Sequence, residues 1–337
     1  MKFGPVPLAE AGGAILAHSM RAIGPGAAPY RIAKGTTLEA QHLRDLAKAS
    51  IAHVIAARLE PGDVHENTAA EHLADAILTG SSGLRARSAR TGRVNLVAHH
   101  AGAVSINAAA ILAANMVDPG ITIATVPVWH RIAAGGLVAT IKIIPYAVPG
   151  DRLAEACAAA RGAIDLHGAQ AATLSLIETR IGPDAPAIKG RRAMAARAAN
   201  FGAALTPRLV VPHQAGAIAA ALSQAPGDVL LILTGSATSD IGDVAPEGLR
   251  LAGGQVDHYG MPVDPGNLLF LGRLGARPVI GLPGCARSPA LNGADWVLER
   301  VICGIPVTPA DIAAMGVGGL LKEIPSRPMP RRSKNLT

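Results

Sequence analysis

Aromatic residues are scarce in this chain of 337 residues, because Phe, Trp and Tyr together make up only 2% of it. Hydrophobic residues nevertheless make up 50%, so the interior must be built from Ala, Leu, Ile and Val. Small aliphatic side chains suit the packing of helices in layers against a sheet. The length is sufficient for two domains that each bury a hydrophobic core.

Cysteine and long hydrophobic runs are also rare. Cys157, Cys285 and Cys303 are odd in number and show no Cys-x-x-Cys spacing, which argues against a structural zinc site and favours a reducing compartment. The longest apolar stretch, residues 101–117, is interrupted by polar side chains and falls short of a bilayer span. The first residues, MKFGPVPLAEAGG, have no apolar core of signal-peptide type. We therefore expect a soluble cytoplasmic protein without a membrane partner.

Acidic residues are outnumbered, with 24 Asp and Glu against 31 Lys and Arg and a net charge of +7. A basic balance favours anionic partners such as phosphates and nucleotides. Part of the excess lies in residues 325–337, where basic residues and prolines alternate, and we predict a basic disordered tail there. Because no aromatic side chain lies among these charges, no specific nucleic-acid binding is expected.

The chain divides near residues 145–151, PYAVPGD, where two prolines and a glycine interrupt the pattern. Residues 1–150 mix short β-like runs, turns and short helices, and predict an α+β accessory region. Residues 151–324 alternate strands and helices, with expected strands at 173–179, 205–211 and 229–234. This alternation predicts a doubly wound, mostly parallel, three-layer α/β domain.

One apolar run in the second domain ends abruptly in a polar loop, LLILTGSATSDIGD at residues 230–243. Val229–Leu233 has no polar interruption, as in a central strand covered on both faces. Ligands of open α/β sheets bind beyond the carboxyl ends of the strands, so the residues from Thr234 to Asp243 form a candidate binding loop. Asp243 also suits the start of a helix. A plain strand–turn–helix connection explains these residues equally well.

Three further loops are expected at the same sheet edge: residues 178–186, residues 212–214, and the pair 261–267 with 281–288. Gly281-Leu282-Pro283-Gly284 ends an apolar strand with two glycines whose amides can approach an anion. Arg287 either adds positive charge there or lies exposed on a helix. The histidines match no metal-ligand spacing, and we interpret them as surface or turn residues; they include His53, His65, His72, His99 and His100.

Several of these segments resemble a known family. Residues 234–238 and 243–247, TGSAT and DVAPE, resemble the T-G-G-T-G and D-V-T-P-E signatures of the molybdopterin-binding domain. That domain is shared by molybdopterin adenylyltransferases and molybdopterin molybdotransferases, and it also occurs in proteins joined to a cytidylyltransferase-type domain. Residues 261–266 and 272–279 look like the family's P-G-K-P and G-x-P-V segments, and 281–288 is similar to G-L-P-G-N-P-x-S. The motifs stand in the family's order across residues 171–304.

The resemblance implies molybdopterin as substrate or ligand, with Mg²⁺ and molybdate as accompanying ions. It implies a catalytic or metal-binding role for Asp243, a homo-oligomer, and a nucleotidyltransferase or molybdoenzyme as protein partner. The residues that it assigns to the pterin phosphate or its nucleotide form are Thr234, Gly235, Ser236, Ala237, Thr238, Asp243, Pro265, Gly266, Gly281, Leu282, Pro283, Gly284 and Ser288.

The chain also departs from the family pattern. Ser236 replaces the second glycine of the loop, His213 stands where the family has an acid, and Cys285 replaces an asparagine. The first half lacks the D-G-Y-A motif of the molybdotransferases. Two hypotheses follow: a protein that binds the pterin for cofactor biosynthesis or delivery, which the departures favour, and an active molybdotransferase or adenylyltransferase that uses Mg²⁺ and Asp243. Nucleic-acid binding through the basic tail is a weaker third hypothesis.

Overall fold

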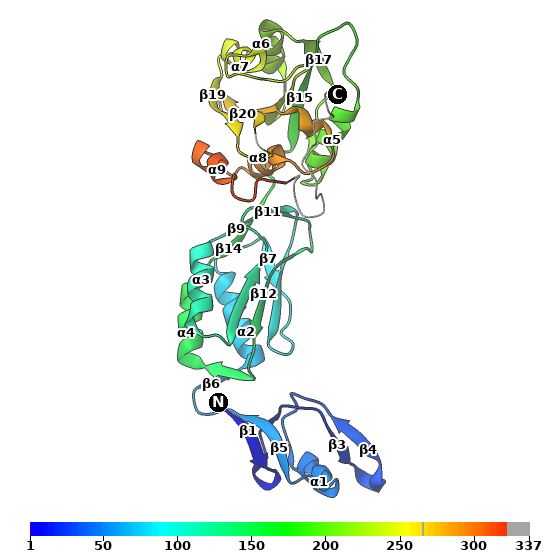
Figure 1. Ribbon diagram of the computed structural model, residues 1–337, viewed down its shortest axis with the longest axis vertical. Helices are drawn as coiled ribbons and strands as arrows, with labels where there is room; N and C mark the ends of the chain where they lie inside the picture. The colour runs from blue at the N-terminus through cyan, green and yellow to red at the C-terminus, as the bar shows by residue number, and fades with distance from the viewer. Residues whose placement is uncertain (265, 322–337) are drawn as a thin grey trace, which may run out of the picture. The chain divides into compact units, whose positions relative to one another are not determined.

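The computed structural model describes residues 1–264 and 266–321, which fold into two compact units (Figure 1). Unit 1 comprises residues 1–100 and 104–166, and unit 2 comprises residues 101–103 and the chain from residue 167 onward. The tail predicted for residues 325–337 and the candidate residue Pro265 lie outside the described residues. Within the described ranges, no helix is both long and apolar enough to span a bilayer.

The first part of unit 1 has a hydrophobic core of its own, in which Leu16, Leu38 and Leu46 are almost completely buried. The core forms between a small sheet of order β1-β5-β2, the hairpin β3-β4 and helix α1. The elements are β1 (Lys2–Pro7), the 3₁₀ turn η1 (Leu8–Glu10), β2 (Ile15–Leu16), β3 (Met20–Ile23), η2 (Pro25–Ala27), β4 (Pro29–Ile32), α1 (Ala40–Lys48) and β5 (His53–Arg58).

The second part of unit 1 has a larger core between helices and a four-stranded antiparallel sheet of order β10-β12-β8-β7. Alternation of apolar and polar residues along β8 and β12 buries one face of this sheet, which includes Val94, Leu96 and Ile141. The elements are β6 (Asp63–His65), α2 (Glu66–Ile77), β7 (Leu84–Ala86), β8 (Arg93–Ala98), β9 (Gly102–Ile106), α3 (Ala108–Val117), β10 (Ile121–Thr125), β11 (His130–Ile132), β12 (Leu137–Ile143), β13 (Ala147–Pro149), α4 (Gly150–Ala159) and β14 (Ile164–Gly168).

The boundary between the units differs from the one predicted after residue 150. Residues 145–151 do not form a linker: Pro149 ends β13, which pairs with β6, and Gly150 is the first residue of α4. Leu153 and Ala156 of α4 and Ile164 of β14 then enter the same core as α2 and β12. These apolar side chains keep the chain in unit 1 as far as residue 166.

Unit 2 is built on a sheet that, in the described part of the chain, has seven strands. The order is β16-β15-β18-β21-β20-β19, and β17 also pairs with β15. β15 and β18 make only parallel pairs, whereas β19, β20 and β21 are joined as antiparallel neighbours. The elements are β15 (Thr173–Arg180), α5 (Lys189–Ala199), β16 (Ala204–Leu205), β17 (Leu209–Pro212), α6 (Ala215–Gln224), β18 (Val229–Leu233), α7 (Val244–Leu251), β19 (Gln255–Met261), β20 (Asn267–Leu274), β21 (Arg277–Leu282), η3 (Gly284–Arg287), α8 (Gly293–Ile302) and α9 (Pro309–Ala314).

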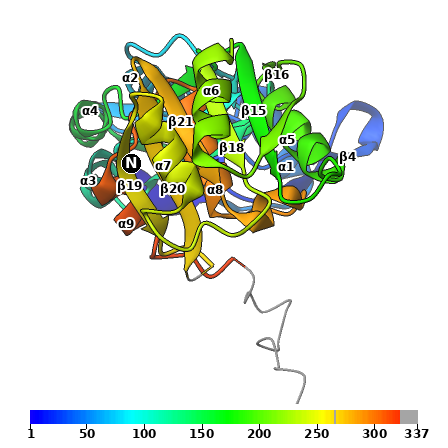
Figure 2. The same cartoon turned by 90° about the horizontal axis from the view of Figure 1, so that it is seen from above.

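β18 is the central strand that its sequence predicts, because every residue from Val229 to Leu233 is buried. Leu230 and Ile232 pack into one core with α6 and α7, which lie side by side in Figure 2. The mixed α/β class expected from the sequence is confirmed. The loop that begins at Thr234 therefore follows directly on the carboxyl end of a rigid, buried strand, β18.

Candidate ligand-binding site

The loop after β18 lies beside the end of β15, and the helices that follow these two strands cover opposite faces of the sheet. Ile232 packs toward α6 and α7, whereas Leu233 faces α5. A Cβ added to Gly190 of α5 would lie 2.9 Å from Cδ2 of Leu233. Because successive strand residues point to opposite faces, α5 and α7 cover opposite sides. α5 follows β15 and α7 follows β18, so a topological switch point lies between these two parallel strands. Ligands of open α/β sheets bind in the crevice at such a point.

A single buried hydroxyl joins three strand ends at the switch point. Thr179 Oγ1 accepts a hydrogen bond from the backbone nitrogen of Gly235 at 2.6 Å and lies 2.9 Å from Nδ1 of His213. Thr179 belongs to β15, His213 follows β17, and Gly235 follows β18. Gly235 must be small at this contact, because a Cβ there would lie 2.9 Å from the carbonyl oxygen of Thr179. The ends of β15, β17 and β18 are therefore fixed relative to one another.

Arg287 links a fourth strand end to the same place. Its guanidinium donates a hydrogen bond to the carbonyl oxygen of Thr234, and its aliphatic stem packs next to Gly190 of α5. The side chain is half-buried. Of the two alternatives that the sequence leaves open, the structure thus gives the one in which Arg287 brings its charge to the loop.

The loop from Thr234 to Asp243 is mostly exposed but is anchored by two buried threonines. Thr234 and Thr238 are buried, whereas Gly235, Ser236 and Ala237 are exposed. The carbonyl oxygen of Thr238 accepts a hydrogen bond of 2.9 Å from the hydroxyl of Tyr259. Burial raises the pKa of Tyr259, and nearby carboxylates reinforce the shift, so this hydroxyl keeps its proton and remains a donor.

Asp243 caps helix α7, as its place in the sequence indicates. One carboxylate oxygen accepts a hydrogen bond from the backbone nitrogen of Val244 at 2.6 Å, and the other accepts one from Ser239 at 3.0 Å. The second contact folds the loop back on itself. Both oxygens therefore already accept a hydrogen bond from the backbone, although each retains a lone pair that could bind a cation.

The segment from Gly281 to Ser288 turns through the short 3₁₀ helix η3 and does not enter helix α8. Leu282 and Pro283 are buried and Gly284 is exposed, while α8 starts only at Gly293, with Asn292 as its cap. Arg197 of α5 holds this segment by donating to the carbonyl oxygens of Ala286 at 3.0 Å, Ser288 at 2.9 Å and Ala290 at 3.2 Å.

The remaining candidate, Gly266, lies in the connection between β19 and β20. β20 runs antiparallel to β21, so it begins at the edge where β21 ends. Gly266 is exposed there with a φ of 80°, which is readily adopted only by glycine. The pairing places this connection on the same sheet edge as Thr234 and Leu282.

An ion pair between the buried Glu178 and the half-buried Arg208 flanks the site at the end of β15. The carboxylate of Glu178, which is 1% exposed, receives hydrogen bonds of 2.8 and 3.1 Å from the guanidinium of Arg208. The same contact raises the pKa of Arg208. Glu178 is thus committed to Arg208. In the described ranges, no group of three or more His, Cys, Asp or Glu side chains is placed to hold a metal ion.

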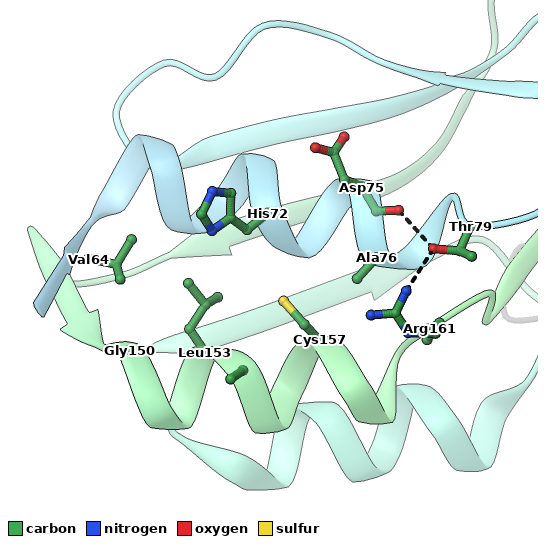
Figure 3. A pocket seen from close by; sticks show the side chains of 10 residues that line it. Val64, His72, Asp75, Ala76, Thr79, Gly150, Leu153, Cys157 and Arg161 are labelled. Atoms are coloured by element: carbon green, nitrogen blue, oxygen red, sulfur yellow. Dashed lines mark hydrogen bonds between the residues drawn. The ribbon is translucent and has the colours of Figure 1, made fainter. Parts of the chain in front are cut away.

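Two cavities lie away from these loops. One of about 590 Å³ in unit 2 is lined by Asp228 and Val229 at the amino end of β18, together with Asp257 and Arg273. The other, of about 520 Å³, lies in unit 1 between α2 and α4 (Figure 3). Neither is lined by a candidate residue.

The groove between α2 and α4 combines apolar and ionisable side chains. His72 and Asp75 of α2 line it, as do Cys157 of α4 and Arg161, which follows α4 (Figure 3). Arg161 lies 3.4 Å from the hydroxyl of Thr79. Burial raises the pKa of the Cys157 thiol, which makes it a poor nucleophile near neutral pH.

Comparisons with known proteins assign no family to the chain as a whole. Residues 5–58, in the first part of unit 1, match a domain of unknown function, DUF8806. No curated protein matches the chain. A crystal structure of the molybdopterin biosynthesis MoeA protein from Pyrococcus horikosii is similar over 92% of this chain and 75% of that one, at 14% identity and a TM-score of 0.29. At that TM-score the similarity carries no weight for fold or function.

Sequence reasoning missed two residues that organise the site, Thr179 and Arg197. Thr179 reads as the last apolar-strand position, and its partners Gly235 and His213 stand 56 and 34 residues away. Arg197 lies in a basic helix whose composition gives no hint of its partners. Arg197 also forms an ion pair with Asp295, which fixes it against α8.

Proposed function

We propose that this chain binds molybdopterin for molybdenum cofactor biosynthesis or delivery, with the pterin phosphate held at the loop from Thr234 to Asp243. The observation that carries the proposal is the hydrogen bond from Gly235 to Thr179 at the switch point between β15 and β18. It supports a ligand crevice at the loop whose sequence resembles the pterin-binding motif. The doubly wound, three-layer arrangement belongs to the same proposal.

The polar groups around this loop suit a phosphate. Ser236 and Ser239 are exposed, and their hydroxyls can donate to phosphate oxygens. Arg287 donates one hydrogen bond to Thr234, and its guanidinium has further N–H groups that can donate to an anion. The turn after Gly281-Leu282-Pro283-Gly284 and the exposed Gly266 would border the ligand on the other side.

Binding without turnover fits the site better than catalysis. Both carboxylate oxygens of Asp243 already accept backbone hydrogen bonds, and Glu178 is paired with Arg208. His213, where the family has an acid, holds Thr179 instead. If Mg²⁺ binds, Asp243 would supply one oxygen and the phosphate others, and the ion would neutralise phosphate charge.

The proposal extends to partners. A protein that holds the pterin without changing it must receive it from, and pass it to, other proteins. We propose a nucleotidyltransferase or a molybdoenzyme in these roles, a homo-oligomeric state, and a cytoplasmic location. Molybdate would arrive with the pterin or bind beside its dithiolene.

The experiment mixes purified protein with molybdopterin under anaerobic conditions, with and without ATP, Mg²⁺ and molybdate. Pterin binding is followed by the change in its absorbance, and nucleotide turnover by release of AMP or pyrophosphate. We expect saturable binding and no nucleotide turnover.

The variant Asp243→Asn separates the two functions. The amide oxygen can still accept one backbone hydrogen bond, so a binding role should survive with a loss of at most about 1 kcal/mol in stability. If the wild-type protein turns over nucleotide and Asp243→Asn does not, the transferase alternative would replace the binding proposal. Absence of binding by the wild-type protein would overturn both.

A further inference from the structure

The hairpin from β7 to β8 in unit 1 carries four arginines and no acid. No Asp or Glu occurs between Asp75 and Asp118. The four side chains are all exposed, and within the described residues none of their guanidinium groups makes a hydrogen bond or an ion pair; they are Arg85, Arg87, Arg90 and Arg93. The protein therefore presents uncompensated positive charge on this hairpin, which we call the arginine hairpin.

Strand register places these charges on one face of the sheet. Arg90 and Arg93 exchange two backbone hydrogen bonds of 3.1 Å, so they are directly opposite each other. Lys142 of β12 is opposite Arg93 on its other side. Like charges that face each other across strands are destabilising. An anionic partner over this face would remove that cost.

The turn of the arginine hairpin is held rigidly. Thr91 and Gly92 have φ values of 49° and 67°, which is the pattern of a type I′ turn. The backbone nitrogen of Gly92 donates to the side chain of Asn67 in α2 at 2.7 Å. Lys142 donates to the carbonyl oxygen of Thr91 and lies 3.6 Å from Glu66. The arginines are thus presented on a fixed backbone.

The edge strand β7 offers backbone groups as well as charge. β7 ends the order β10-β12-β8-β7, so one of its sides has no strand partner among the described residues. On either side of β7, the backbone nitrogen of Arg87 donates to the carbonyl oxygen of Asn95, and the carbonyl oxygen of Gly83 accepts from the backbone nitrogen of His99. In an antiparallel pair, alternate residues bond to the partner strand, so residues 83, 85 and 87 face β8. The backbone groups of Ala86, between them, point to the open side.

We propose that an acidic segment of a partner protein adds to β7 as a further strand. An added strand forms backbone hydrogen bonds with the open edge, and its side chains alternate between faces with the same two-residue period. Carboxylates at alternate positions would then lie beside Arg85 and Arg87, which share a face. The same arginines repel basic strands and so restrict the edge to acidic ones.

The composition of the face favours a peptide over a nucleic acid. The side chains around the arginines on this face include Asn95, Thr122 and Thr140. None of these three side chains is aromatic, so they provide no platform on which bases can stack. A strand edge, by contrast, is a recognition element for peptides.

The experiment measures binding of fluorescent peptides to the full chain by anisotropy. One peptide alternates Glu with Val, and its isomer has the same composition with all Glu residues contiguous. We expect the alternating peptide to bind at least about tenfold more tightly. The double variant Arg85→Gln/Arg87→Gln should weaken its binding by about tenfold, as expected for two lost ion pairs of modest strength.

Two variants serve as controls. Arg21→Gln/Arg31→Gln removes the same charge from the exposed hairpin β3–β4 in the first part of unit 1, where the two residues are opposite each other. This double variant should leave binding unchanged. Ala86→Pro removes one outward N–H without changing charge and should weaken binding. Equal binding of the two peptides, an unchanged affinity of Ala86→Pro, or tighter binding of an oligouridylate than of the alternating peptide would each overturn the proposal.

Discussion

The hydroxyl of Thr179 lies 2.6 Å from the backbone nitrogen of Gly235 and 2.9 Å from Nδ1 of His213. Residues far apart in sequence therefore meet at the carboxyl edge of the parallel half of the unit 2 sheet. Because Thr179 is completely buried, its hydroxyl has no solvent to replace a lost partner.

Replacing Thr179 with Val should loosen this edge. The substitution keeps the shape of the side chain but leaves the Gly235 N–H without its acceptor, which should cost about 1–3 kcal/mol of stability. Hydrogen exchange at the Gly235 amide should accelerate. Thr173→Val, at the other end of β15, is the matched control, and its effect should be confined to that end. Unchanged exchange at Gly235 would show that this contact does not hold the loop.

Two helical glycines in unit 2 should respond in opposite directions to alanine. A Cβ on Gly248 of α7 would lie 2.7 Å from Ile218 of α6, whereas a Cβ on Gly216 of α6 would have no neighbour within 4 Å. Gly248→Ala should destabilise unit 2 by about 1–3 kcal/mol through overpacking. Gly216→Ala should stabilise it by up to about 1 kcal/mol through helix propensity. Thermal unfolding measures both, and equal shifts would contradict the packing of α6 against α7.

Acid should destabilise unit 2 through Asp228. Its carboxylate accepts a hydrogen bond from the backbone nitrogen of Thr173 at 2.8 Å, and this bond is the main reason that the pKa of Asp228 is lowered. A lowered folded pKa means that the contribution is complete above the unfolded pKa of about 3.9 and is lost as the pH falls through the folded value. As the pH falls below about 4, the melting temperature of the wild type should therefore fall more steeply than that of Asp228→Asn. Parallel pH profiles would refute this role.

The thiols of Cys157 and Cys303 should resist alkylation in the native protein. Burial raises the pKa of Cys303 to about 11, so its thiolate fraction near pH 8 is lower than that of an ordinary thiol by more than about a hundredfold. Cys157 should also react more slowly than in the unfolded chain. Mass spectrometry after iodoacetamide treatment resolves each site. Rapid modification of Cys303 would contradict its burial.

Features carried by local chemistry are predictable from the sequence. The helix start that the sequence predicts at Asp243 is confirmed, because the capping side chain lies directly before the first residue of α7. The buried run of β18 likewise identifies a central strand.

Features that depend on distant partners are not predictable in this way. The strand expected over residues 205–211 divides into β16 and β17, and Thr206, between them, bonds to Ser175 across the sheet at 2.9 Å. The boundary between the units lies after residue 166 and not near residue 150, because α4 packs into the core of unit 1. Thr179 and Arg197 show no local signal, since their partners are assembled only by the fold.

The most direct test of the central claim is the dissociation constant of molybdopterin for the wild-type protein, Thr179→Val and Thr173→Val, measured by anaerobic titration. The account predicts saturable binding by the wild type, a loss of about tenfold or more in Thr179→Val, and wild-type affinity in Thr173→Val. Equal affinities in all three proteins would show that the pterin binds elsewhere than at the switch point between β15 and β18.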